Sequence, residues 1–130
     1  LVLGGGPQEK IRALDIFNQL NNHRVIEVCS EPIRVNANII AKAKLMVTSD
    51  TGPMHVGFAT KTPVVALFGT ISRNSGPYNI PVNLCRIIKV DPAIKEDEEP
   101  NVNKFNFEGI TVNMVWKQVE ELIAENSSPN

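Results

Sequence analysis

The sequence predicts an α/β protein in which helices cover both faces of a parallel β-sheet. Short apolar runs alternate along the chain with segments whose apolar residues recur at helical spacing. The run PVVALF at residues 63–68 is apolar at every position, which is typical of a strand buried between two layers of helices. Glycine, proline and asparagine gather between these segments, as turns require.

Each element follows from its local pattern. The first apolar run ends at Gly4-Gly5-Gly6-Pro7, and Glu9 then lies in the first turn of a helix with one apolar stripe. The expected strands span residues 1–3, 25–29, 45–48, 63–68 and 84–90. The expected helices span residues 9–20, 35–43, 53–60 and 112–126, with Thr111 as the cap of the last one.

Length and composition limit the function classes. The 130 residues suit a single domain over residues 1–126, with a disordered tail at 127–130. The net charge of −1 gives no basic surface for nucleic acid. No apolar stretch reaches the roughly 20 residues that span a bilayer. The chain begins inside a strand, LVLGGGP, without a methionine, so we expect it to be a piece of a longer protein.

Two cysteines, Cys29 and Cys85, stand in apolar surroundings without a CxxC pair or a His/Cys cluster. This pattern favours two buried thiols in a reduced, cytoplasmic protein, while a disulfide stays open as the alternative. No pattern predicts a metal site, a paired-carboxylate site, a Ser-His-Asp triad or a cysteine nucleophile.

The stretch TSDTGPMH at residues 48–55 carries the most chemistry. Gly52 permits close approach of a ligand, Pro53 suits the first helical position, and the helix that follows would present its amino end to an anion such as a diphosphate. Thr51 and His55 can add side-chain donors. Asp50 either caps the helix or accepts hydrogen bonds from a polyol, and His55 can equally be a structural histidine.

Two other loops follow expected strands. In LGGGPQEK, Glu9 either accepts the two hydroxyls of a ribose or complements the helix dipole. In GTISRNSGPYN, Arg73 is either a phosphate partner or part of an ordinary exposed loop. The acidic run at residues 96–99 is expected to be a solvated charge cluster. Met54 and Trp116 occupy apolar positions and are expected in the core.

The segment AKAKLMVTSDTGPMHVGFATKTPVVALFGTISRNSGPYN at residues 41–79 resembles the carboxyl-terminal half of the family 9 glycosyltransferases, the ADP-heptose:lipopolysaccharide heptosyltransferases. LVLGGGPQEK and ITVNMVWKQVEELI resemble an earlier strand-turn-helix and the closing helix of the same domain. The resemblance implies a Rossmann-like domain, the carboxyl-terminal half of a GT-B enzyme. It further implies that this half binds a nucleotide sugar and that the enzyme inverts the anomeric centre.

Residue roles follow from the same resemblance. Asp50 would bind hydroxyls of the donor heptose, and Glu9 would meet the adenosine ribose. The diphosphate would be held by a set of consecutive residues: Thr51, Gly52, Pro53, Met54 and His55. Additional donor contacts are expected near the base from Glu31 and, after the fourth strand, from Gly69 and Arg73.

The resemblance places the general base in an amino-terminal domain, so no catalytic residue is expected in this chain. It implies ADP-heptose or a related nucleotide sugar as donor, with no cofactor or metal required. The acceptor would be lipopolysaccharide or a lipid-linked glycan, bound through the other domain. The expected location is the cytoplasm, with peripheral association at the inner face of the inner membrane. Two alternatives remain: an epimerase-like nucleotide-sugar enzyme and a non-catalytic α/β nucleotide-binding module.

Overall fold

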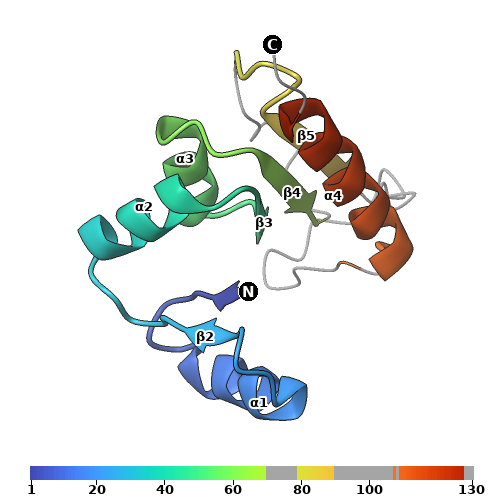
Figure 1. The fold of residues 1–130 in the computed structure, drawn as a ribbon. Helices are drawn as coiled ribbons and strands as arrows, with labels where there is room; N and C mark the ends of the chain where they lie inside the picture. Colours follow the sequence, from blue (N-terminus) through green and yellow to red (C-terminus); the bar gives the residue numbers. More distant parts are fainter. Residues whose placement is uncertain (70–78, 90–106, 108, 128–130) are drawn as a thin grey trace, which may run out of the picture. The chain divides into compact units, whose positions relative to one another are not determined.

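The computed structural model describes residues 1–69, 79–89, 107 and 109–127 (Figure 1). The chain divides into two compact units, Leu1–Ile39 and Ile40–Asn130. The boundary falls within helix α2 (Ile33–Lys42). None of the helices in the described part of the chain is long and apolar enough to cross a membrane.

The first unit holds two short parallel strands and one complete helix. Strand β1 (Val2–Leu3) pairs with β2 (Ile26–Glu27), and helix α1 (Lys10–Leu20) connects them. Helix α1 ends where Asn21 takes a left-handed conformation, with φ of 40°. Asparagine tolerates this conformation better than most residues, which agrees with the predicted stop at Asn21.

The second unit is built on three parallel strands in the order β3, β4, β5. These are β3 (Met46–Ser49), β4 (Val64–Phe68) and β5 (Cys85–Lys89), and helix α3 (Gly52–Ala59) connects β3 to β4. Ser49 is paired with Leu67, and Phe68 with Lys89, so the three strands end at one common edge of the sheet. The predicted parallel α/β class is therefore confirmed.

Helices α3 and α4 (Val112–Ser127) cover opposite faces of this sheet (Figure 1). One cluster joins Met54 of α3 to alternate residues of β4, Val64, Ala66 and Phe68. The cluster on the other face joins Val65 and Ile88 to Val119 and Leu122 of α4. The alternation along β4 sends its side chains to both layers, as the unbroken apolar run PVVALF predicts.

Trp116 is a correction to the predicted core. Its side chain is 59% exposed, although Val119 and Leu122 on the same helix are buried. The indole Nε1 donates a hydrogen bond of 2.8 Å to the Glu120 carboxylate, one turn further along the helix. Helical spacing places Trp116 beside the buried stripe rather than in it. Met54, the other predicted core residue, is fully buried, as predicted.

The last helix agrees closely with the sequence prediction at its start and extends further at its end. The Thr111 hydroxyl accepts a hydrogen bond of 3.2 Å from the Met114 N–H, which is the predicted capping interaction. The helix continues through Ser127, so this residue is helical rather than part of the predicted tail. Residues 128–130, the acidic run at 96–99 and Arg73 lie outside the described residues.

Candidate functional site

The segment Asp50–His55 lies at the carboxyl edge of the three-stranded sheet, where parallel α/β proteins bind their ligands. Asp50 follows β3 directly, and its N–H donates a hydrogen bond of 3.2 Å to the Leu67 carbonyl of β4. This bond fixes the start of the loop to the neighbouring strand. The Asp50 side chain is half-buried, whereas Thr51, Gly52, Pro53 and His55 are exposed.

The amino end of α3 differs in detail from the predicted cap. Thr51 is the capping residue, with extended backbone angles, but its hydroxyl donates to the Ser49 carbonyl at 3.3 Å instead of bonding an N–H of the helix. The helix begins at Gly52, so Pro53 is its second residue and not its first. Proline is tolerated there because the N–H groups of a first turn have no partner within the helix.

These facts limit which backbone groups can meet a ligand. Pro53 has no N–H, and the N–H of Met54 donates to the Thr51 carbonyl at 3.0 Å. The Met54 side chain is fully buried and anchors the first turn to the sheet. The backbone donor that helix geometry directs outward is therefore the N–H of Gly52. The Thr51 hydroxyl and the His55 ring are the neighbouring polar side-chain groups.

Gly52 has no reason within the described fold to be glycine. Among the described residues, a Cβ atom built on it would meet no atom within 4 Å outside its chain neighbours and the backbone of its own helix. Its φ lies outside the left-handed region. Gly57, in the same helix, gives the opposite result. Its Cβ would lie 2.8 Å from Val64 Cγ2, so Gly57 is required where the helix packs on β4. Space in front of Gly52 is therefore open to a ligand.

His55 is exposed in the first turn of α3. Its ring packs edge-to-face against Phe58, with 6.4 Å between ring centroids and 77° between their planes. This contact holds one side of the imidazole while the residue remains accessible. His55 therefore has a packing contact within α3, and its exposed ring can still donate a hydrogen bond to an anion.

The turn between β1 and α1 lies in the other unit and is organised by Glu9. One carboxylate oxygen of Glu9 accepts a hydrogen bond of 2.6 Å from the Gly6 N–H, and Glu9 immediately precedes the helix. A Cβ on Gly5 would lie 2.9 Å from the Glu9 Cβ and 3.3 Å from the Cys29 Sγ. Gly5 is thus needed by the fold itself. The Glu9 carboxylate is exposed and keeps a second oxygen with which to accept hydroxyl groups.

The remaining predicted contacts are distributed over the two units. Exposed Glu31 lies in the first unit, where its carbonyl accepts a bond of 2.8 Å from the Asn36 side chain. Gly69 follows β4 at the same edge as Asp50 and is half-buried. The structure thus brings Asp50–His55 and Gly69 to one edge, and places Glu9 and Glu31 in the other unit.

Neither cysteine has the properties of a nucleophile. Both are free, Cys29 is buried as predicted, and Cys85 is only half-buried. Burial raises the pKa of the Cys29 thiol, and the nearby Glu27 carboxylate adds to this effect. Burial also raises the pKa of the Cys85 thiol, with a smaller opposing effect of Arg86. Both thiols therefore stay protonated at neutral pH, and a protonated thiol is a poor nucleophile.

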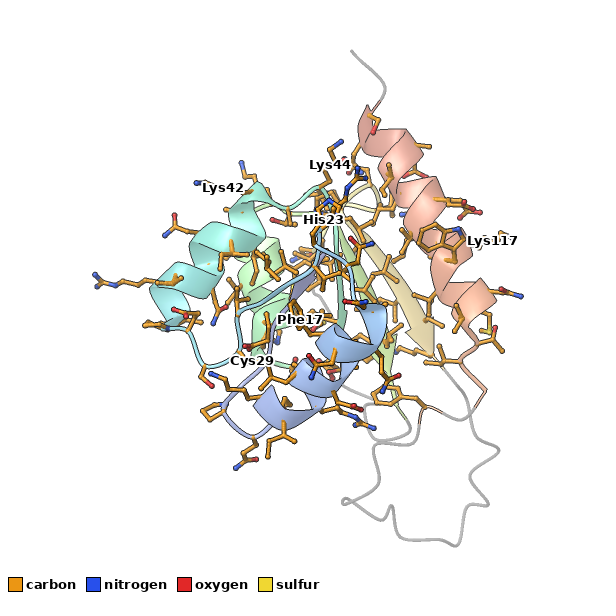
Figure 2. The ribbon with its side chains drawn as sticks, turned by 60° about the horizontal axis from the view of Figure 1, so that its bottom comes forward. Phe17, His23, Cys29, Lys42, Lys44 and Lys117 are labelled. Carbon is orange, nitrogen blue, oxygen red and sulfur yellow. The ribbon has the colours of Figure 1, made fainter. Side chains whose placement is uncertain are left out.

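Lys89 is a further cation at this edge of the sheet, and no sequence motif singles it out. This residue ends β5 at the edge that carries Asp50, and its ammonium lies 5.3 Å from the centroid of the Phe68 ring. The available signal was its position, since it is a cationic side chain at the carboxyl end of a buried strand. Lys44 and Lys117, labelled in Figure 2, belong to other regions: Lys44 precedes β3, and Lys117 projects from the outer side of α4.

Comparison with known proteins agrees with this architecture. Residues 1–104 match the model of glycosyltransferase family 9 (heptosyltransferase). The fold is similar to the crystal structure of the glycosyl transferase family 9 from Veillonella parvula DSM 2008, with a TM-score of 0.74 and 24% sequence identity. The similarity covers 95% of this chain but 36% of that one, so the chain spans about a third of its structural relative. No curated protein sequence matches. Because the family match extends over most of the sequence, the chain belongs to glycosyltransferase family 9.

Proposed function

We propose that this chain is the donor-binding part of an inverting glycosyltransferase that uses ADP-heptose or a related nucleotide sugar. The observation that carries the proposal is the open space in front of Gly52, at the amino end of α3. Asp50, Thr51 and His55 flank Gly52 along the chain, between the end of β3 and the first turn of α3. A glycine that the fold does not need, at a helix end suited to anions, supports binding of the donor diphosphate there.

Within this proposal, the residues divide the donor between them. The Gly52 N–H and the His55 ring donate to the diphosphate oxygens. The Thr51 hydroxyl would join them by turning its proton away from the Ser49 carbonyl. Asp50 accepts hydrogen bonds from hydroxyls of the sugar, a role that suits a carboxylate beside a diphosphate better than direct contact with phosphate. In the first unit, Glu9 keeps one carboxylate oxygen that does not bond Gly6 and that can accept hydrogen bonds from hydroxyl groups.

The reaction would be a single displacement. A base in another part of the enzyme removes the proton of an acceptor hydroxyl, whose oxygen attacks the anomeric carbon of the donor. The bond from that carbon to the diphosphate oxygen breaks, and its electron pair leaves with the nucleoside diphosphate. Negative charge therefore grows next to the amino end of α3, which stabilises it without needing a bound metal. The acceptor we propose is lipopolysaccharide or a related lipid-linked glycan.

Calorimetric titration with ADP, UDP and ADP-heptose tests this function. We expect the chain to bind ADP more tightly than UDP, and Asp50→Ala to weaken ADP-heptose binding about tenfold. Because Asp50 is assigned to the sugar, ADP binding should change by less than about twofold. Asp15→Ala removes the same charge from α1, where the carboxylate bonds Gln19, and should alter neither titration.

Other outcomes would favour other functions. Preference for UDP would favour an epimerase-like nucleotide-sugar enzyme, and absence of nucleotide binding by the folded chain would favour a non-catalytic module. Circular dichroism of each sample separates loss of binding from loss of structure.

A further inference from the structure

We propose that Lys89 is a cationic partner of the donor's phosphoryl groups and completes the anion site at the amino end of α3. The inference rests on the proposed donor-binding function and adds a residue from another strand to it. Three observations carry it: the place of Lys89 in the sheet, its contact with Phe68, and the packing that links Phe68 to α3.

The sheet places Lys89 at the ligand-binding edge. In the second unit β3 ends at Ser49, β4 at Phe68 and β5 at Lys89, so Lys89 is the charged residue among the three strand ends. Neighbouring strands lie about 4.8 Å apart, so the backbones of β3 and β5 are separated by about 10 Å. An extended lysine side chain is long enough to bridge much of that separation.

The contact with Phe68 shows which way the side chain leans. The Lys89 ammonium lies 5.3 Å from the ring centroid of Phe68, on the strand between β5 and β3. A cation over an aromatic face is attracted by the ring's quadrupole. The side chain is therefore held toward the middle of the sheet edge.

The packing of Phe68 connects this ammonium to α3. Phe68 is 1% exposed and shares a buried cluster with Met54, in the first turn of the helix. The Lys89 ammonium thus lies on the helix α3 face of the sheet, against a ring that packs with the residue between Pro53 and His55. A diphosphate at Gly52 would bring a strong negative charge to this side of the edge.

The chemistry gives Lys89 a specific task. Pro53 removes one backbone donor from the first turn, and the Met54 N–H is bonded to Thr51, so the backbone supplies few donors for a diphosphate. An ammonium has three donors and a full positive charge. It would bind the ground-state diphosphate and interact more strongly as that group leaves, since charge on its bridging oxygen grows.

ADP and adenosine titrations of Lys89→Gln test the proposal. We expect ADP binding to weaken about tenfold, the loss expected for one hydrogen bond to a charged group, while adenosine binding stays the same. Lys89→Arg keeps the charge and should bind ADP within about threefold of the unaltered chain. Lys44→Gln is the matched control, because it removes the same charge next to the amino end of β3 and should not change ADP binding.

The outcomes separate this proposal from the proposed function. If the unaltered chain binds ADP and Lys89→Gln binds it equally well, Lys89 has no such role while donor binding stands. Equal losses in Lys89→Gln and Lys44→Gln would show a general charge effect and overturn the assignment. If the folded, unaltered chain binds no ADP, both proposals fail. Thermal unfolding of each variant checks that the fold is retained.

Discussion

Replacing Phe68 by alanine is expected to lower the free energy of unfolding by about 3–5 kcal/mol, the largest effect on stability that we predict. Phe68 is 1% exposed and belongs to the cluster of Met54, Val64 and Ala66 that joins α3 to the sheet. Truncation removes the transfer free energy of a buried ring and leaves a cavity between helix and sheet. Urea unfolding followed by circular dichroism measures the change.

Trp116→Ala is the control for this prediction. It removes a larger aromatic ring, but the ring is 59% exposed and its polar contact is a surface hydrogen bond to Glu120. We expect a change within about 0.5 kcal/mol, as for most surface substitutions. Trp116 is the one tryptophan of the sequence, so circular dichroism rather than fluorescence should follow both variants. A Trp116→Ala loss as large as that of Phe68→Ala would contradict the described packing of α4.

The second large effect is expected at Gly52, where one added methyl group should weaken ADP binding without lowering the free energy of unfolding. Gly52→Ala places a Cβ in open space, so the free energy of unfolding should stay constant or rise by up to about 1 kcal/mol. The same methyl would occupy the space that we assign to the diphosphate. ADP affinity should therefore fall about tenfold, or about 1.4 kcal/mol.

Gly57→Ala makes the same chemical change five residues further along α3. It should lower the free energy of unfolding and leave ADP affinity unchanged. Its Cβ would lie 2.8 Å from Val64 Cγ2 and 3.5 Å from Met46 Sδ, in a fully packed region. We expect a loss of about 1–3 kcal/mol in unfolding free energy, with ADP affinity preserved in the fraction that remains folded. Gly52→Ala with normal ADP affinity would remove the main support for a ligand at this helix end.

The sequence predicted the parallel α/β class well because the relevant patterns are local and strong. PVVALF predicts a strand buried on both faces, and the structure sends its side chains into two cores. The Asn21 stop and the Thr111 cap follow from backbone preferences of single residue types, which tertiary packing did not override.

Trp116 shows where such patterns fail. Its helical spacing is compatible with the buried stripe, but a stripe covers a range of angles, and only packing decides which side chains at its border are covered. The division of the chain into two compact units is a property of a different kind. It depends on contacts between elements, and apolar periodicity does not specify those contacts.

The sequence predicted which segment forms the candidate site, but it did not predict which hydrogen bonds the groups of that segment make. TSDTGPMH predicts a strand-to-helix junction, and the structure confirms that position. It does not predict that the Thr51 hydroxyl donates to the Ser49 carbonyl or that the Met54 N–H donates to the Thr51 carbonyl. The place of Lys89 could not be predicted in the same way, because the strand pairing that brings it to this edge is a long-range property.

The most direct test of the central claim, that the amino end of α3 binds the donor diphosphate, is an amide NMR titration of the chain with ADP. We expect the signals of Thr51, Gly52, Met54 and His55 to shift in a saturable way with ADP. Adenosine, which lacks phosphate, should move them much less, and α4 signals such as Gln118 should not follow. A folded spectrum in which ADP binds and leaves all four signals in place would contradict the claim.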